Sequence, residues 1–482
     1  MPPNHSLLDQ RLAALRALPG LSGAHVDLFG ALLRDGDDWD CFRINPLTFG
    51  ETRGMSSRES IDLFLHATRA GLLELRFNLI CPGCGSVEHQ LASMDLVPSH
   101  AWYCVVCQRE IQAELDDRVE VSFSAELGVR HLELDIYGSA ANYGRYYFSK
   151  NVMRAPEMQA FVASLSMGML TVKPGADASI TLQLEPGQTY RLLSLDNHSQ
   201  VLLIPGAGAR EVEISSTPDG MTPPRVEVAT GPVTVRVMNR GSMPLGAFAM
   251  RVDADTVMRI AQESPNQFRP FLTARTLLNS QTFRDLFRVQ TLDANMRLRL
   301  RSLTLLFTDL KGSTELYDRT GDIRAYTFVR EHFKVLSEAV KRHNGALIKT
   351  MGDAIMASFN EPTDAARAAL EMMQGMDSLN ADLKAQGYDT GLKVGLHEGP
   401  ALAVSSDERL DYFGQTVNVA ARVQGLAQAG EIWLTPSVMD SPGVGAAMSG
   451  AGWTGEQKDV SLKGVGGSTR VFRMQRAAVA AS

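Results

Sequence analysis

The sequence predicts a multidomain α+β protein with a helical N-terminal region, an all-β middle region and a C-terminal region in which strands and helices alternate. A chain of 482 residues is too long for one ordinary hydrophobic core. Apolar residues recur at helical spacing early in the chain and with a period of two in its middle. We expect boundaries at residues 1–120, 121–252, 253–296 and 297–475, followed by a disordered tail at 476–482.

Composition narrows the class of protein. Hydrophobic residues make up 44% and charged residues 21%, as in ordinary globular proteins. A formal net charge of -7 gives no reason to expect a nucleic acid or an anionic membrane as partner. No apolar run reaches the ~18–20 residues that cross a bilayer, and the first residues do not read as a secretory signal. We therefore expect a cytoplasmic protein whose cysteines stay reduced.

The first 120 residues combine helices with a cysteine cluster. A helix is predicted in "SRESIDLFLHATRAGLLEL", with Ser57 as its N-cap and Gly71 as its end. Two pairs of cysteines follow in the spacing C-x2-C-x19-C-x2-C, and they are Cys81, Cys84, Cys104 and Cys107. Four thiolates in this spacing predict a zinc ribbon holding one structural Zn²⁺, since no coordination position is left open for catalysis.

Residues 121–252 predict an antiparallel β-sandwich. The runs "SITLQLEPGQTYRLLSL", "REVEISS", "RVEVATGPVTVRVMNRG" and "GAFAMRV" alternate apolar with polar residues between turn-forming residues. A helix is expected in "RAPEMQAFVASL". Over 253–296 helical spacing returns as a linker, where "NSQTFRDLF" offers Asn279 or Ser280 as a cap.

Two aspartates mark the C-terminal region. Asp309 ends the apolar strand "LTLLFTDL", and Asp353 lies in "ALIKTMGDAIMASF", which predicts a β-hairpin with a Met-Gly turn. Two carboxylates brought together repel each other unless divalent cations lie between them, and paired cations activate and stabilise oxygens in phosphoryl transfer. Two plainer interpretations stay open: Asp309 as a helix cap, and Asp353 in an ion pair with Lys349 across the hairpin.

A third segment, "RLDYFGQTVNVAARVQGLA", adds Asp411, Asn418 and Arg422. Asn418 and Arg422 are four residues apart, which places them on one face of the helix that starts at Gly414-Gln415-Thr416. An amide beside a guanidinium suits negative charge developing on phosphorus. Asn418 is expected to be half-buried and to need a hydrogen-bond partner. A plainer interpretation of Arg422 is a solvent-exposed charge on the helix.

The motifs "FTDLKGST", "IKTMGDAIMASF", "GLHEGP", "DYFGQTVNVAARV" and "SLKGVGG" occur in this order. Together they resemble the catalytic domain of class III adenylyl cyclases over about Leu298 to Met474. The resemblance implies a ferredoxin-like, palm-type core. It also implies a homodimer in which each active site lies between two catalytic domains, so that Asp353 and Lys349 of one chain face different nucleotides.

The resemblance also implies roles for individual residues. Asp309, Asp353 and the backbone carbonyl of Leu310 would bind two Mg²⁺ or Mn²⁺ ions per site. Lys349 and Asp411 would recognise adenine, and Asn418 would orient the ribose. Arg422 would stabilise the transition state, and Lys463 would contact the terminal phosphates.

Base recognition favours ATP, because an aspartate accepts from the adenine amine and a lysine donates to the ring N1, whereas guanine has the opposite polarity there. The expected product is 3′,5′-cyclic AMP. The alternatives are a guanylate cyclase, a diguanylate cyclase, which would carry a different loop in place of "TMGDAIMASF", and a catalytically silent binding protein. The first ~295 residues are expected to regulate the catalytic domain in response to a small molecule or a protein.

Overall fold

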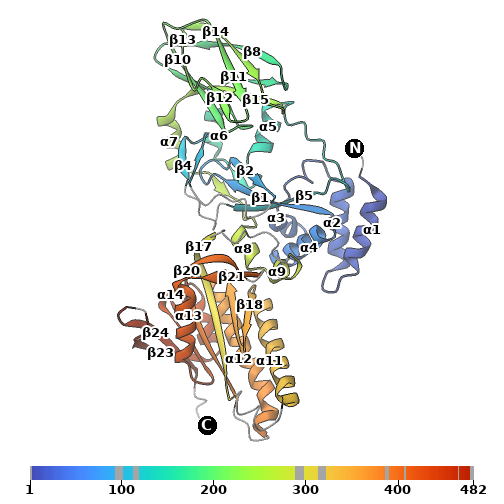
Figure 1. Ribbon diagram of the computed structural model, residues 1–482, viewed down its shortest axis with the longest axis vertical. Helices are drawn as coiled ribbons and strands as arrows, with labels where there is room; N and C mark the ends of the chain where they lie inside the picture. The colour runs from blue at the N-terminus through green and yellow to red at the C-terminus, as the bar shows by residue number, and fades with distance from the viewer. Residues whose placement is uncertain are drawn as a thin grey trace. The chain divides into compact units, whose positions relative to one another are not determined.

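A computed structural model describes residues 3–92, 101–111, 119–287, 298–312, 322–385, 390–406, 409–464 and 466–477 (Figure 1). The chain divides into two compact units. The first comprises residues 1–60, 70–113 and 118–272, and the second comprises residues 61–69, 114–117 and 273–482. The predicted linker 253–296 is therefore divided, because residues up to Leu272 belong to the first unit.

The N-terminal part begins with helices and continues into a small sheet. Its elements are α1 (His5–Arg16), α2 (Gly23–Asp35), α3 (Pro46–Glu51), α4 (Ser57–Arg69), β1 (Leu73–Ile80), β2 (Val87–Leu91), β3 (Trp102–Cys104), β4 (Arg109–Ile111) and β5 (Val119–Ala125). The strands pair in the order β2-β1-β5, with β3 and β4 as a separate hairpin. Because β5 pairs with β1, the boundary predicted after residue 120 falls inside a strand of this sheet.

The predicted helix around Ser57 is present, but its cap lies one residue earlier. The backbone N–H of Glu59 donates to Ser56 Oγ at 3.2 Å, and the backbone N–H of Ser56 donates to Glu59 Oε2 at 2.9 Å. This is a reciprocal capping box, in which two otherwise unpaired N–H groups are satisfied. The sequence offered two adjacent serines, and only Ser56 stands three residues before the glutamate.

Two sheets follow along the chain. Their elements, with the flanking ones, are α5 (Ala140–Tyr147), β6 (Val152–Met153), α6 (Pro156–Leu165), β7 (Ser166–Val172), β8 (Asp177–Leu184), β9 (Thr189–Ser194), β10 (Ser199–Gly206), β11 (Glu211–Thr217), β12 (Gly220–Thr222), β13 (Arg225–Ala229), β14 (Gly231–Asn239), β15 (Leu245–Val252), α7 (Ala254–Glu263) and β16 (Gln267–Phe268). The orders are β13-β10-β9-β15-β7 and β12-β11-β14-β8. Both sheets contribute to one apolar core, to which Leu192, Val201 and Val235 belong.

The strands predicted in this region are present, and "RAPEMQAFVASL" contains α6 as expected. The pairing is not purely antiparallel, however. β10 pairs with β13 and β11 pairs with β14 in parallel. Alternation of apolar residues shows which face of a strand is buried but not the direction of its neighbour, so the sequence could not predict these two pairs.

The second unit has the βαββαβ order of a ferredoxin-like fold. Its elements are α8 (Ala274–Leu278), α9 (Gln281–Leu286), β17 (Leu298–Lys311), α11 (Asp322–Arg342), β18 (Ala346–Met351), β19 (Ala354–Phe359), α12 (Pro362–Ala385), β20 (Gly391–Ser406), β21 (Arg409–Phe413), α13 (Gln415–Leu426), β22 (Glu431–Leu434), α14 (Pro436–Met439), α15 (Val444–Gly450), β23 (Trp453–Val460) and β24 (Thr469–Arg476). The strands follow the order β18-β19-β17-β20-β22-β24-β23, and β21 pairs with β20.

Helices cover both faces of this sheet. Ile432 and Leu434 of β22 lie in the core that also contains Leu336 of α11 and Met372 of α12. Trp433 lies in a second core with Val423 of α13. Since successive residues of a strand point to opposite faces, α13 packs on the face opposite α11 and α12. In the part of the chain that the structure describes, no helix is long and apolar enough to cross a membrane.

Candidate functional site

Asp309 lies near the end of β17, directly opposite Lys393 of β20 in the antiparallel register. The Lys393 Nζ atom is 2.7 Å from Asp309 Oδ2, and both side chains are partly exposed. The neighbouring Leu310 turns its side chain into the core. The segment after Gly312 in which Asp309 could act as a helix cap lies outside the described residues. Lys393 was not singled out from the sequence, because only the pairing of β17 with β20 brings it to Asp309.

Asp353 occupies the tip of the β18–β19 hairpin. Met351 pairs with Ala354, so the turn consists of Gly352 and Asp353, one residue later than the Met-Gly turn that we predicted. Gly352 has a φ of 66°, a left-handed conformation that glycine adopts without strain. The turn therefore places Asp353 outside the strand pairing.

The pairing of β19 with β17 brings the two aspartates to the same end of the sheet. Phe307 lies opposite Met356, and the Ile355 N–H donates to Thr308 Oγ1 at 3.0 Å. Continuing this register places Asp309 beside the turn that carries Asp353.

The surroundings of Asp353 fit a cation-binding role. Its Oδ2 atom is buried and has no hydrogen-bond partner among the described residues. An unpaired buried carboxylate oxygen is costly, and coordination to a cation would satisfy it. Its backbone carbonyl lies 2.9 Å from His332 Nε2. Burial lowers the pKa of His332, so the imidazole is neutral and donates the Nε2 hydrogen to this carbonyl.

Lys349 and Asp411 come together, although they are far apart in the sequence. Lys349 Nζ lies 2.6 Å from Asp411 Oδ2, which joins β18 to β21. The other oxygen of this carboxylate, Oδ1, accepts from the Tyr412 N–H at 2.8 Å. Lys349 therefore contacts Asp411 and not Asp353, which rules out the ion pair across the hairpin that its sequence position allowed.

Asn418 and Arg422 lie one turn apart on α13, as the spacing predicted. The helix packs closely on β20, since a Cβ atom at Gly395 would lie 2.2 Å from the Gln424 nitrogen. Asn418 is exposed, which corrects the expected half-burial: Val419 faces the core and Asn418 does not. A Cβ atom at Gly464 would lie 3.2 Å from Arg422 Nη2, so the turn that carries the exposed Lys463 lies against Arg422.

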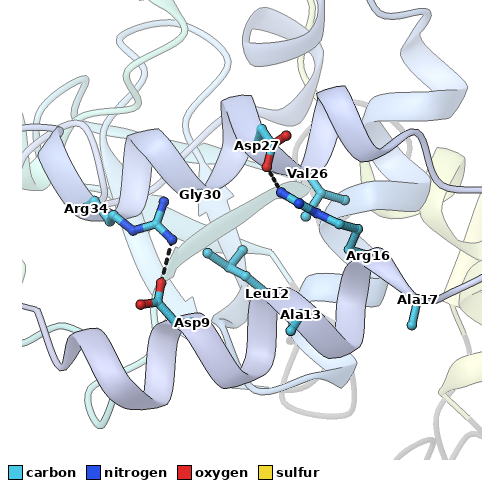
Figure 2. A pocket seen from close by; sticks show the side chains of 9 residues that line it. All are labelled: Asp9, Leu12, Ala13, Arg16, Ala17, Val26, Asp27, Gly30 and Arg34. Atoms are coloured by element: carbon cyan, nitrogen blue, oxygen red, sulfur yellow. Dashed lines mark hydrogen bonds and ion pairs between the residues drawn. The ribbon is translucent and has the colours of Figure 1, made fainter.

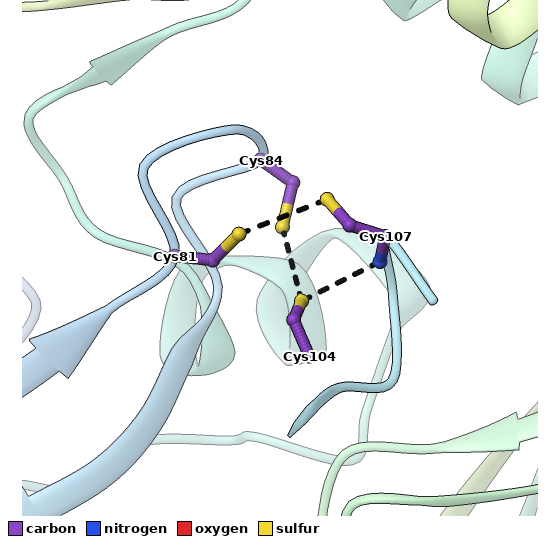
Figure 3. Close-up of side chains that lie close together, drawn as sticks. All are labelled: Cys81, Cys84, Cys104 and Cys107. Atoms are coloured by element: carbon purple, nitrogen blue, oxygen red, sulfur yellow. Dashed lines mark hydrogen bonds between the residues drawn. The ribbon is translucent and has the colours of Figure 1, made fainter. Parts of the chain in front are cut away.

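The four cysteines of the first unit converge (Figure 3). Their sulfurs all lie within 4.8 Å of one another, with Cys81–Cys107 at 3.7 Å and Cys84–Cys104 at 3.8 Å. Sulfurs bound at ~2.3 Å to a tetrahedral zinc ion would be ~3.8 Å apart. The donor set and its spacing fit zinc.

Side chains from other parts of the first unit surround this cluster. The buried Arg191 of β9 donates to the carbonyls of Val105 and Val106, each at 3.3 Å, in the second cysteine loop. Asn266 Nδ2 donates to the carbonyl of Gly83 in the first loop at 2.8 Å. A buried cation beside the cluster would offset part of the negative charge that four thiolates carry when they bind a metal ion. Neither residue carries a sequence signal, because both approach the loops only through the fold.

A hollow of about 420 Å³ lies between α1 and α2 (Figure 2). Its charged lining residues form two ion pairs between the helices, Arg34–Asp9 at 2.5 Å and Arg16–Asp27. All four charges in the lining are thus compensated within the hollow, and Leu12 forms an apolar part of its wall. We assign no chemistry to it.

Comparisons with known proteins cover both units. Residues 8–285, more than half of the chain, match a family of unknown function, DUF5939, and residues 297–472 match the adenylate and guanylate cyclase catalytic domain. An adenylate cyclase of Anabaena cylindrica is 34% identical over 139 residues, which are 27% of this chain and 28% of that protein. Adenylate cyclase 1 of Rhizobium meliloti is 30% identical over 138 residues, 26% of this chain and 21% of that one. The matched segment thus spans only about a quarter of these relatives.

Solved structures are also similar to part of this chain. The adenylyl cyclase CyaB from P. aeruginosa is 22% identical, with a TM-score of 0.33, and the match covers 38% of this chain and 97% of that one. The guanylyl cyclase Cya2 is 20% identical, with a TM-score of 0.32, over 38% of this chain and 96% of the other.

Proposed function

Because the chain belongs to the DUF5939 family and its last third is a class III nucleotidyl cyclase catalytic domain, we propose that it converts ATP to 3′,5′-cyclic AMP and pyrophosphate. The observation that carries this proposal is the contact between Lys349 and Asp411, 2.6 Å apart in the folded chain. A neighbouring ammonium donor and carboxylate acceptor match N1 and the amine of adenine. Guanine presents an acceptor O6 and a donor N1 at the same positions. The carboxylate would then face an acceptor and the ammonium a donor, so neither could form its hydrogen bond.

Two divalent cations, Mg²⁺ or Mn²⁺, would polarise the ribose 3′-hydroxyl and neutralise charge on the phosphates when bound. Asp309 and Asp353, with the carbonyl of Leu310, would hold them at the β17 and β19 ends. Asn418 orients the ribose for in-line attack on the α-phosphorus, and Arg422 stabilises the negative charge that develops there. Lys463, in the turn against Arg422, holds the terminal phosphates and the departing pyrophosphate.

In this proposal the enzyme is a homodimer. The groups that hold the cations come from one chain, and the groups that recognise the base and stabilise the transition state come from its partner. Two equivalent sites then follow from the two-fold axis. The N-terminal region regulates the catalytic domain in response to a small molecule or a protein, and its cysteine cluster binds one structural Zn²⁺.

The direct test is an assay of the purified protein with ATP and Mn²⁺, with products separated by chromatography and identified by mass spectrometry. Cyclic AMP and pyrophosphate in equal amounts are the expected products. A parallel reaction with GTP should be slower by ~10²-fold or more, because mismatched buried polar groups each cost ~1–3 kcal/mol. Cyclic GMP and pyrophosphate, formed from GTP faster than cyclic AMP forms from ATP, would instead identify a guanylate cyclase. Formation of no cyclic nucleotide from either substrate would identify a catalytically silent binding protein.

Base recognition can be tested by reversing the polarity of the pair. The double variant Lys349→Glu, Asp411→Ser should lose ATP turnover by ~10²-fold or more and shift the ratio of kcat/KM toward GTP. The matched control is Lys458→Glu, Asp459→Ser, which alters an adjacent lysine and aspartate of β23. An unchanged ATP to GTP ratio in the Lys349, Asp411 variant would contradict the assignment of these residues to the base.

Lys393 should compete with a cation for Asp309. Its ammonium lies 2.7 Å from Asp309 Oδ2, so a metal ion that binds this oxygen would have to displace it. We expect Lys393→Met to tighten Mn²⁺ binding several-fold, about 1 kcal/mol or less for a partly exposed pair. The measurement is a titration of free Mn²⁺ by electron paramagnetic resonance without nucleotide. Lys458→Met is the control, and equal affinities of the two variants would show that Lys393 does not compete.

A further inference from the structure

A short segment ahead of β17 is bound tightly to the strands of the catalytic domain. The segment consists of α8, α9 and the two residues between them, Asn279 and Ser280. Asn279 is 2% exposed, and its Oδ1 accepts from Ser358 Oγ at 2.6 Å and from Tyr412 OH at 3.0 Å. Its Nδ2 donates to Asn360 Oδ1 at 2.7 Å. This buried amide thus joins the segment to β21 and to the end of β19.

Two residues of α9 extend the contact. Gln281 Oε1 accepts from the Leu347 N–H of β18 at 2.8 Å. The guanidinium of Arg284 donates to the Leu410 carbonyl of β21 and, at 3.3 Å, to the Leu278 carbonyl at the end of α8. It also lies 6.0 Å from the centre of the Tyr412 ring. The capping residue of α9 is Ser280, whose hydroxyl accepts from the Phe283 N–H, so Asn279 is not needed as a cap and is available for these contacts.

These bonds converge on the pair assigned to the base. Asp411 stands between Leu410, whose carbonyl Arg284 holds, and Tyr412, whose hydroxyl Asn279 holds. Lys349 follows two residues after Leu347, which Gln281 holds, with the β-bulge of β18 between them. Side chains of one segment therefore hold the Leu410 carbonyl and the Tyr412 side chain on the two sides of Asp411, and the Leu347 N–H just ahead of Lys349.

We propose that Asn279 and Arg284 are positioning residues that set the geometry of Lys349 and Asp411, and with it the preference for adenine over guanine. This inference rests on the proposed function. The physical reason is that two hydrogen bonds to a base require both partners within a few tenths of an ångström of their places. Among the described strands β21 pairs only with β20, so the bonds from the segment add to the constraints on its position. A displacement of this segment would weaken recognition of the base, whereas none of the bonds described above is made to Asp309 or Asp353 themselves.

The test uses the full chain and the variant Arg284→Met, with Arg284→Lys as the conservative rescue. The matched control is Arg330→Met, which removes an exposed arginine of α11 in the same unit. We expect Arg284→Met to lower kcat/KM for ATP about tenfold, mainly through KM. The ratio of kcat/KM for ATP to kcat/KM for GTP should fall by a similar factor. Arg284→Lys should restore part of the ratio, and the control should leave it unchanged.

A role in folding alone would reduce turnover of ATP and GTP in equal proportion, and that result would overturn the proposal. If Arg284→Met does not fold, Tyr412→Phe supplies the second variant, since it removes only the hydroxyl that Asn279 binds. In this variant too, kcat/KM for ATP relative to that for GTP should fall, and an unchanged value would count against the proposal. Displacement of a fluorescent ATP analogue by ATP and by GTP measures the same preference without turnover. Failure of the wild-type protein to form cyclic AMP would therefore count against the proposed function and leave this test available.

Discussion

Homodimers carrying Asp309→Ala or Asn418→Ala should each retain about 1% of wild-type activity or less, and a mixture of the two should recover about a quarter of it. The losses follow because a missing cation ligand or a missing group at the reacting phosphate costs ~10²–10³-fold or more. Recovery follows from symmetry. Random exchange makes about half of the dimers mixed, and each mixed dimer has one intact site out of two. The measurement is the rate of cyclic AMP formation after the two variants are incubated together.

A second mixture provides the control. Asp309→Ala and Asp353→Ala both damage the cation-binding half, so every dimer that they form has two defective sites and no activity should return. If activity returned in this control, recovery in the first mixture could not be attributed to one intact site per mixed dimer. If the first mixture stays as inactive as its components although exchange is demonstrated with tagged chains, each chain must build its own complete site.

The second large effect concerns the cysteine cluster. The purified protein should contain one zinc ion per chain, and Cys104→Ser should abolish the bound zinc and strongly destabilise the first unit. Structural zinc sites bind with an apparent ~10–16 kcal/mol, and much of this energy is folding energy. Cys104 is completely buried, and its sulfur lies 3.8 Å from that of Cys84, so a serine there cannot complete the thiolate set. Zinc content by elemental analysis and the unfolding temperature by calorimetry are the measurements.

Cys41→Ala is the matched control, because Cys41 is equally buried but lies outside the cluster, where its thiol lies 3.4 Å from the Leu32 carbonyl. It should retain one zinc ion per chain. Native protein without zinc, whose stability does not respond to a chelator, would refute the zinc site. Chelation that leaves the rate of cyclic AMP formation unchanged would confine the ion to a structural role within the N-terminal region.

Much of the local structure was accessible from the sequence. Period-two alternation located the strands of the middle region, and apolar residues at helical spacing located α9. The ordered motifs indicated the ferredoxin-like domain, and they identified Asp309, Asp353, Lys349 and Asp411 as candidate site residues. The cysteine spacing placed four sulfurs in one cluster. These signals are local because hydrogen bonding of turns and burial of one face depend on residues that are near each other in the chain.

Tertiary structure decided the rest. The pairing of Lys349 with Asp411, of Asp309 with Lys393, and of Arg191 with the second cysteine loop each joins residues more than sixty positions apart. So do the contacts of Asn279 with Ser358 and Tyr412. Periodicity shows that a side chain faces a core but carries no information about which distant strand lies beside it, nor whether that strand runs parallel. Strand order and register supply that information, and they arise only when the whole core packs.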